Sequence, residues 1–307
     1  MEKRQIGSSD LFVSKMGLGC MSLGTEEKAA KEIVQHALEN GINYLDTADL
    51  YDFGQNEEIV GNAIREVRDD IILATKVGNR WDDVEDGWRW DPSKSYIKSA
   101  VKDSLSRLKV DYIDLYQLHG GTIEDHFEET IEAFEELKSD GLIRHYGISS
   151  IRPNVIKRFL KSSSIESVMM QYSLLDRRPE EWMDLLDENK VSIVARGPLA
   201  KGLLSEKMLS KASAKMKESG YLDYSYQELQ ETIESIHSKM GDQRNMNELA
   251  LQYILSHQSV AAVVPGASSV QQLQENIDAV NASPLSTEAL NMLKHLTKLS
   301  RYEQHRD

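Results

Sequence analysis

Short apolar runs alternate with amphipathic segments along most of the 307-residue chain. Several of these runs are continuously apolar, which is typical of strands that are covered on both faces. The runs predict eight strands, at 13–19, 42–48, 71–77, 112–119, 143–149, 167–172, 191–197 and 261–267.

The segments between these runs have the spacing of helices. Residues 26–40 repeat apolar positions at helical spacing and stop before Gly41, a helix-ending signal. Residues 91–108 open with Asp91, an expected N-cap, followed by Pro92 in the first turn. Further helices are expected within 122–141, 247–257 and 269–282.

The alternation of strand and helix predicts an α/β fold with a parallel sheet and right-handed crossovers. Eight such units in about 250 residues favour a (β/α)8 TIM barrel, and we expect a single domain over residues 1–307. A doubly wound open sheet is the competing architecture. A doubly wound sheet that binds a dinucleotide usually has a G-x-G-x-x-G turn early in the chain. The glycine-rich stretch at 16–24 lacks that spacing.

Composition narrows the classes of partner. The chain has 36 Lys and Arg against 50 Asp and Glu, a net charge of −14, and no cluster of basic residues stands out. This argues against a nucleic-acid partner and against an anionic membrane surface. With Cys20 as the single cysteine, no intrachain disulfide can form. The N-terminus lacks the apolar segment of a signal peptide, and no run of 18 apolar residues exists, so we expect a cytoplasmic protein. The sequence does not indicate the oligomeric state.

Chemically active residues stand at the ends of three neighbouring predicted strands. Asp46 ends the second strand, with Tyr51 on the loop after it, while Lys76 and His119 lie at the ends of the third and fourth strands. In a barrel these ends form one rim, which is where such folds carry their chemistry. A buried lysine or aspartate is costly unless paired, so Asp46 and Lys76 are expected to satisfy each other.

The four residue types together suit proton transfer to a carbonyl. A tyrosine is a weak acid near neutral pH, and a neighbouring lysine ammonium stabilises a phenolate. The aspartate would hold the lysine, and the histidine could orient a carbonyl oxygen. Such a tyrosine can protonate a developing alkoxide, while a cofactor must supply the hydride. Taken singly, Asp46 could be a helix cap, Lys76 an ion-pair partner and His119 a structural residue.

Several segments resemble signature segments of the aldo-keto reductase family. They are GINYLDTADLY (41–51), ILATKVG (72–78), DYIDLYQLHG (111–120), GLIRHYGISS (141–150) and VVPGASSVQQLQENIDA (263–279). The opening, IGSSDLFVSKMGLGCMSLG (6–24), resembles the bacterial and potassium-channel β-subunit-like branches. The resemblance implies a TIM barrel with an N-terminal β-hairpin cap and an extra C-terminal helix. It also implies NADP(H) and the reversible reduction of aldehydes and ketones, with a small-molecule carbonyl or alcohol as substrate. The family's catalytic tetrad falls on Tyr51, Asp46, Lys76 and His119.

The same resemblance assigns a cofactor site. Ser149 and Gln171 would bond the nicotinamide carboxamide, beside Ser150 where relatives commonly have Asn. Lys207 matches a basic position and would meet the 2′-phosphate, since residues 266–274 contain no Lys or Arg. The other assigned residues are Gly19, Cys20, Met21, Asp46, Arg196, Gly197, Pro198, Leu199, Gly266, Ser268, Gln272, Glu275 and Asn276.

Arg196 stands where the family usually has an aromatic residue that stacks on the nicotinamide. A planar guanidinium can also stack, and its charge beside an oxidised, cationic ring should disfavour NADP+ relative to NADPH. Alternatively, Arg196 turns toward the pyrophosphate or an acidic substrate, or forms an ordinary ion pair at the rim.

The substrate side is expected in two segments. Residues 79–91 contain Trp88 and Trp90, which we expect to bind substrate together with Tyr51 and His119. Packing against the barrel exterior is the alternative for these tryptophans. The long stretch 200–245 is expected to be a cofactor clamp or pocket edge.

Three functions are compatible with these features. The first is an NADP-dependent aldo-keto reductase, and the second is a non-catalytic, NADP(H)-sensing regulatory subunit on the same fold. The third, a metal-dependent barrel enzyme, would need several ligands at strand ends, where only Asp46 and His119 qualify. We therefore expect no metal site.

Overall fold

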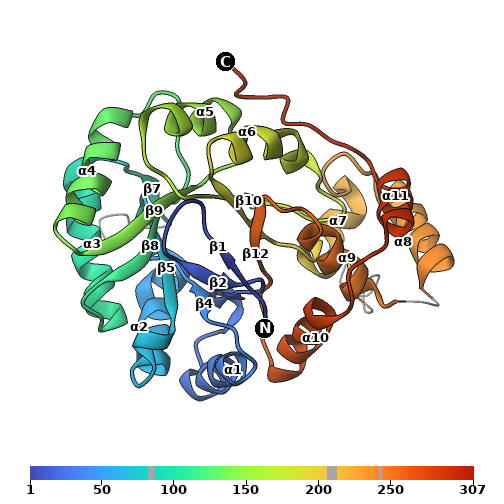
Figure 1. Ribbon diagram of the computed structural model, residues 1–307, viewed down its shortest axis with the longest axis horizontal. Coiled ribbons are helices and arrows are strands. Elements are labelled where there is room, and N and C mark those ends of the chain that lie inside the picture. Colours follow the sequence, from blue (N-terminus) through green and yellow to red (C-terminus); the bar gives the residue numbers. More distant parts are fainter. Residues whose placement is uncertain (82–86, 206–212, 242–243) are drawn as a thin grey trace.

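The computed structural model describes residues 1–81, 87–205, 213–241 and 244–307, and its central feature is an eight-stranded parallel sheet (Figure 1). Its order is β12-β11-β10-β9-β8-β5-β4-β3, so neighbouring strands follow one another along the chain. The strands are β3 (Leu18–Gly19), β4 (Tyr44–Asp46), β5 (Ile72–Val77), β8 (Ile113–Leu118), β9 (Ile143–Ser149), β10 (Ser167–Gln171), β11 (Ser192–Arg196) and β12 (Val260–Val264).

Backbone contacts between the first and last strands close the sheet into a barrel. The Gly17 N–H donates to the Val263 carbonyl at 2.8 Å, and the Gly19 N–H donates to the Pro265 carbonyl at 3.1 Å. The parallel bridges Met16↔Val263 and Gly19↔Gly266 continue this pairing. The predicted (β/α)8 barrel is thereby confirmed, and the open-sheet alternative is wrong.

Helices surround the barrel (Figure 1). In the described part of the chain, one α-helix follows each of β3, β4, β5, β8, β9 and β10, three follow β11, and two follow β12. They are α1 (Glu27–Glu39), α2 (Gln55–Ile64), α3 (Lys94–Leu108), α4 (Phe127–Ser139), α5 (Pro153–Ser162), α6 (Met183–Glu188), α7 (Ala214–Ser219), α8 (Tyr226–Met240), α9 (Met246–Leu255) and α10 (Val270–Asn281). The extra C-terminal helix is α11 (Thr287–Leu296), which contacts α8.

An antiparallel hairpin, β1 (Lys3–Gln5) and β2 (Phe12–Ser14), caps one end of the barrel. Its Ile6, Leu11 and Val13 are buried in one cluster with strand residues such as Tyr44 and Leu115. In Figure 1 it lies in the middle of the ring of helices. The predicted first strand at 13–19 is therefore wrong in extent, because its first residues belong to this hairpin and its last two form β3.

The start of α3 also differs from the prediction. The Ser93 hydroxyl, not the Asp91 carboxylate, accepts from the Tyr96 N–H and is the N-cap. Asp91 accepts from the Ser93 N–H at 3.2 Å and from its hydroxyl at 2.6 Å. Asp91 thus orients the cap instead of forming it.

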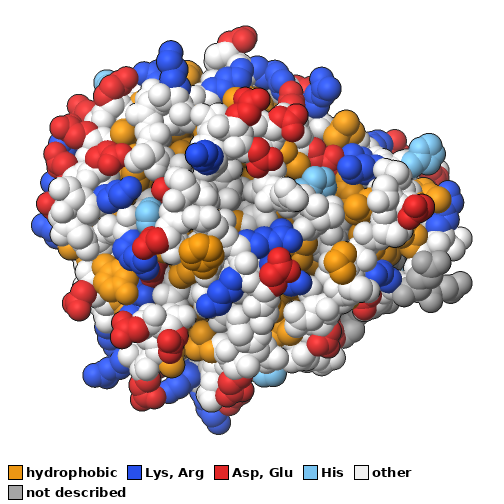
Figure 2. Space-filling view, viewed as in Figure 1, with side chains coloured by type: hydrophobic (Ala, Val, Ile, Leu, Met, Phe, Trp, Pro, Cys, Tyr) orange, Lys and Arg blue, Asp and Glu red, His pale blue; other side chains and the backbone are white. Residues whose placement is uncertain are grey.

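The surface carries mixed charge. Acidic and basic side chains are interspersed over the face shown in Figure 2, with apolar side chains between them. Among the described helices, none has the length and apolar character needed to span a membrane.

Candidate active site

The barrel brings the four predicted catalytic residues to one rim. Asp46 ends β4, Lys76 lies one residue before the end of β5, and His119 directly follows β8. Tyr51 begins a short 3-10 turn, η2 (Tyr51–Gly54), that leads into α2. Parallel pairing of β4 with β5 and of β5 with β8 aligns these strand ends.

The Lys76 ammonium connects the group. Its Nζ donates to Asp46 Oδ2 at 2.7 Å, to the Thr47 carbonyl at 2.7 Å and to Tyr51 Oη at 3.2 Å. An ammonium has three N–H donors, so all of them are used. Gln117 Nε2 donates to the other carboxylate oxygen of Asp46 at 3.3 Å. Lys76 is therefore locked between its carboxylate partner and the phenol.

Burial and pairing act in opposite directions on this ion pair. Burial acts to lower the pKa of Lys76, but the Asp46 carboxylate and the Tyr51 oxygen outweigh it and raise that pKa above its usual value. Lys76 therefore stays an ammonium. Burial raises the pKa of Asp46, while Lys76 and Gln117 oppose that rise.

His119 is held as a neutral imidazole beside the phenol. The centroids of the Tyr51 and His119 rings are 6.0 Å apart, and the rings meet edge to face. Burial, together with the positive charges of Lys76 and Arg196, lowers the pKa of His119 to about 3. Its Nδ1 is buried and, within the described residues, has no hydrogen-bond partner.

The loop that carries Tyr51 is strained and well supported. Asp52 and Phe53 have φ angles of 47° and 51°, in the left-handed region that non-glycine residues rarely adopt. The loop is tied down behind Tyr51, because the Thr47 hydroxyl donates to Asn56 Oδ1 at 2.7 Å and Asn56 Nδ2 donates to the Cys20 carbonyl at 2.9 Å. Asn56 was not predicted from the sequence, because an asparagine on an otherwise amphipathic helix is a weak signal.

A cavity of about 910 Å³ opens over this rim and collects most of the predicted cofactor residues. Tyr51, His119 and Trp88 also line it. The predicted cofactor residues that line it are Gly19, Met21, Asp46, Ser149, Gln171, Arg196, Gly197, Pro198, Leu199, Gly266, Gln272, Glu275 and Asn276.

Two predicted cofactor residues are placed differently. The Cys20 side chain is fully buried, and neither Cys20 nor Ser268 is among the residues that line the cavity. The Ser268 hydroxyl instead donates to Gln272 Oε1 at 3.0 Å. Lys207 lies outside the described residues.

Residues that were not predicted individually from the sequence also line the cavity. Lys201 and Ser205 come from the segment after β11, and Asn247 comes from α9. Tyr221 lies in the stretch 200–245, which was expected to supply a clamp or pocket edge. That stretch is partly helical, with α7 and α8 in its described part.

Gln171 and Arg196 lie side by side at the ends of β10 and β11, where they are paired in register. Gln171 Nε2 donates to Asp176 Oδ2 at 2.9 Å and to Tyr221 Oη at 3.3 Å. Arg196 Nη1 donates to Gln171 Oε1 at 3.4 Å. Asp176 and Tyr221 thus fix the amide of Gln171, which in turn positions the exposed Arg196.

The tryptophans of the loop after β5 divide between two environments. Trp88 lines the large cavity and, with Trp90, a smaller cavity beside it. Trp81 instead packs edge to face on Phe53, with ring centroids 5.8 Å apart, and lies near Arg107. Trp81 therefore packs against neighbouring side chains, while Trp88 and Trp90 line cavities, where their contact with substrate stays a prediction.

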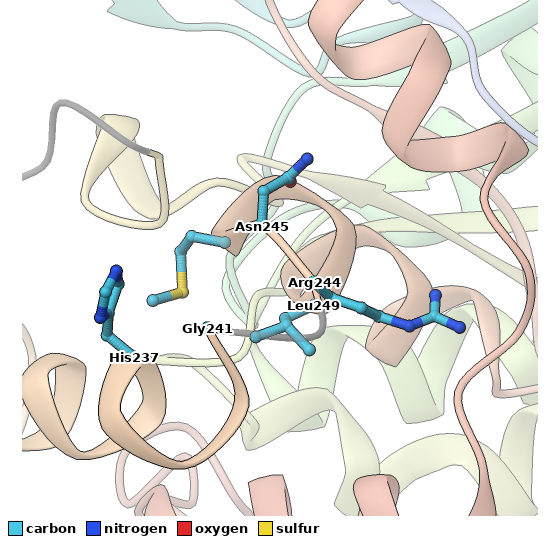
Figure 3. Close-up of a pocket in the computed structure, with 6 residues that line it drawn as sticks. His237, Gly241, Arg244, Asn245 and Leu249 are labelled. Carbon is cyan, nitrogen blue, oxygen red and sulfur yellow. The ribbon is translucent and has the colours of Figure 1, made fainter.

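A separate cavity of about 300 Å³ lies where α8 leads into α9 (Figure 3). The Arg244 side chain points away from His237 in this view and donates to Ser283 Oγ at 2.9 Å. Asn245 caps α9 through the Glu248 N–H. These polar groups hold elements together, so we assign this cavity no chemistry.

Comparisons with known proteins agree with this geometry. Residues 15–298 match the family model of the aldo/keto reductase family. An uncharacterised oxidoreductase of Bacillus subtilis strain 168, YqkF, is 61% identical over 306 residues, with full coverage of both chains. The NADH-specific methylglyoxal reductase of Escherichia coli K12 is 28% identical, covering 98% of this chain and all of the relative.

The fold also matches a solved structure over its whole length. The aldo-keto reductase AKR11C1 from Bacillus halodurans, in its holo form, is 59% identical with full coverage of both chains and a TM-score of 0.94. The apo form of that protein matches with a TM-score of 0.87. The chain belongs to the aldo/keto reductase family, as its sequence motifs indicated, and is an oxidoreductase built on that family's TIM barrel.

Proposed function

We propose that this protein is an NADP(H)-dependent reductase of aldehydes and ketones, with Tyr51 as the general acid and the reverse alcohol oxidation also open to it. The observation that carries this proposal is the contact of Lys76 Nζ with both Asp46 and Tyr51 at the wall of a cavity of about 910 Å³. Each residue of this group would be a costly choice if it served only to fill the barrel.

The residues around the cavity suit a nicotinamide dinucleotide. Glycines keep part of its wall open: a Cβ on Gly266 would lie 2.3 Å from Ser22 Oγ, and Gly197 has a φ of 61°. Gln272, in the first turn of α10, also faces the cavity, and a helix start favours a phosphate. We assign the cofactor to the predicted residues that line the cavity, with Ser149 and Gln171 toward the carboxamide.

The chain's own groups would handle the proton while the carbonyl is reduced. A reduced nicotinamide, when bound, supplies a hydride. Tyr51 Oη would donate its proton to the carbonyl oxygen, and the neutral His119 would orient that oxygen through Nε2. Lys76 would stabilise the resulting phenolate, and Asp46 would keep Lys76 in place. Burial of the group strengthens each of these electrostatic contacts.

The preference for NADP(H) over NAD(H) is part of the proposal. Lys201 supports it, because this cation lines the same cavity and could meet an additional phosphate. A relative that is NADH-specific by name makes NADH the competing cofactor. Fluorescence titrations with NADPH and NADH test the preference, and equal dissociation constants would refute it.

The activity is tested by following NADPH absorbance with a panel of aldehydes and ketones. Removing the acid in Tyr51→Phe should lower kcat by about 10²- to 10⁴-fold while leaving NADPH affinity unchanged. Tyr112→Phe is the matched control, because Tyr112 lies against Arg68, before β8, and does not line the cavity. If the wild type binds NADPH yet reduces no carbonyl compound, the protein is instead a cofactor-sensing subunit.

A further inference from the structure

A smaller cavity of about 240 Å³ adjoins the catalytic group. Asn79, Trp88, His119, Ser149 and Arg196 line both this cavity and the large one. A substrate whose carbonyl meets His119 can therefore extend its remaining atoms into the smaller cavity. What lines that space decides which carbonyl compounds fit.

One wall of the smaller cavity is a fixed aromatic surface. The Trp90 Nε1–H donates to Asp125 Oδ1 at 2.9 Å. The Trp90 ring lies against the backbone of Gly78 and Gly120, where an added Cβ would come within 2.6 and 3.1 Å of its Cζ3 atom. This wall cannot move aside easily, so it sets the width of the space.

Two guanidinium groups face the same space. Arg152 is partly buried, and its Nη1 donates to the Gly121 carbonyl at 2.6 Å, two residues after His119. Arg196 comes from the end of β11 and contacts Gln171. In the part of the chain that the structure describes, neither arginine has a carboxylate within ion-pair distance. By contrast, Arg144 pairs with both Asp10 and Asp114.

The start of α5, which adjoins this cavity, offers no free backbone donors to a ligand. The backbone N–H groups of the first turn of α5 are already used. Asn154 donates to the His305 carbonyl at 2.8 Å, Val155 to Asn154 Oδ1 at 2.8 Å and Ile156 to the Arg152 carbonyl at 3.0 Å. The backbone N–H groups of this helix start are therefore committed, and the two guanidinium groups are the cationic donors at this wall.

We propose that the smaller cavity selects carbonyl substrates that carry an anionic group, a carboxylate or a phosphate, and that Arg152 is the specificity-determining residue. The planar fork of N–H donors matches both anions, and Arg196 adds a second positive charge at the boundary with the large cavity. In a chain of net charge −14, two guanidinium groups on one cavity that have no carboxylate partner among the described residues favour an anionic ligand there. The inference rests on the proposed carbonyl reduction.

The test compares substrates of nearly equal shape and different charge. For the wild type, KM should be lower for 4-formylbenzoate than for its neutral methyl ester. Arg152→Gln keeps a donor for the Gly121 carbonyl but removes the charge. It should raise KM for 4-formylbenzoate about 10- to 100-fold, the worth of a charged hydrogen bond, and leave kcat and the ester's KM almost unchanged. Arg152→Lys should restore part of the loss.

Arg158→Gln is the matched control, because Arg158 lies on α5, whose N-cap is Arg152, pairs with Glu128 and does not line either cavity. It should change neither substrate's KM. Glyceraldehyde 3-phosphate should likewise have a lower KM than glyceraldehyde, if the cavity accepts a phosphate as it accepts a carboxylate. Equal KM values for each charged and neutral pair in the wild type, or an equal rise for both in Arg152→Gln, would overturn the proposal.

A binding measurement separates this inference from the proposed function. Calorimetric titration of the NADPH-loaded protein with benzoate and benzamide does not require turnover. Benzoate should bind more tightly than benzamide, and Arg152→Gln should remove that difference. If the protein reduces carbonyl compounds but binds benzoate and benzamide equally, only the proposed selection of anionic substrates is refuted. Charge-selective binding without any carbonyl reduction refutes only the proposed function.

Discussion

At the scale of single residues, the Lys76–Asp46 pair couples chemistry to stability. Both side chains are almost fully buried. Lys76→Met would leave the Asp46 carboxylate buried without its partner, so we expect the free energy of unfolding to fall by about 3–5 kcal/mol and kcat to fall as well. Denaturant titration and NADPH consumption measure the two effects.

The double variant Asp46→Leu/Lys76→Met is the control for this coupling. Replacing both charges by apolar groups removes the uncompensated carboxylate, so its loss of stability should be smaller than the sum of the single losses. Its activity should remain as low as that of the single variant. Additive losses of stability would show that the two groups do not depend on each other.

The lowered pKa of His119 predicts that the free energy of unfolding depends on pH. Its pKa falls from 6.5 to about 3 in the folded protein because of burial and the charges of Lys76 and Arg196. Between these values the unfolded chain binds a proton that the native site does not, so the free energy of unfolding decreases as pH decreases. The slope is at most about 1.4 kcal/mol per pH unit.

His119→Gln should show a flatter decrease over the same range, measured by chemical denaturation at several pH values. An imidazole signal of His119 that titrates near pH 6.5 by NMR would contradict the assigned neutral state.

At the scale of elements, the hairpin cap is fastened to the barrel by a charged contact. His145 of β9 lies with Nε2 2.7 Å from Asp10 Oδ1 and Nδ1 3.5 Å from Glu166 Oε1. Glu166 also accepts from the Ser8 N–H at 2.8 Å, and Arg144 Nη2 lies 2.8 Å from Asp10 Oδ2. The contact with Glu166 is the main cause that raises the pKa of His145.

This contact should respond to pH in the direction opposite to that of His119. Because the folded-state pKa of His145 is raised, its contribution is complete below about pH 6.5 and is lost as pH rises through the raised value. The stability difference between wild type and His145→Gln should therefore shrink as pH increases from 6 to 9. A constant difference across that range would show that His145 contributes only by packing.

The close packing of α2 against α3 predicts that a larger residue at their contact lowers stability. Gly61 of α2 lies against α3, and a Cβ there would come within 2.3 Å of the Leu108 carbonyl oxygen. Although alanine favours helix more than glycine does, we expect Gly61→Ala to lower stability by about 1–3 kcal/mol through overpacking. Thermal unfolding measures it, with Glu58→Ala on the exposed face of α2 as control. A more stable Gly61→Ala would mean that the helices separate at little cost.

For the whole molecule, the repeating pattern of strands and helices was predictable from the sequence. Residues whose roles depend on contacts between distant parts of the chain were not. The barrel followed from eight apolar runs, and the barrel rule alone placed Asp46, Lys76 and His119 at one rim. Asn56 was missed because its importance comes from its contact with the Cys20 carbonyl, and Arg152 because only the folded chain brings it to the smaller cavity, against the Gly121 carbonyl. The prediction of Asp91 as the N-cap was wrong because the hydroxyl of Ser93, two residues later, accepts from the Tyr96 N–H and caps the helix instead.

The proposed function requires Tyr51, Lys76, Asp46 and His119 to act on a carbonyl beside a bound nicotinamide. A crystal structure of the protein with NADPH tests it most directly. We expect the nicotinamide carbon that donates the hydride to lie in the large cavity, facing a position about 3–3.5 Å away where Tyr51 Oη and His119 can hold a carbonyl group. A nicotinamide bound elsewhere, or a Tyr51 hydroxyl pointing away from it, would contradict the account.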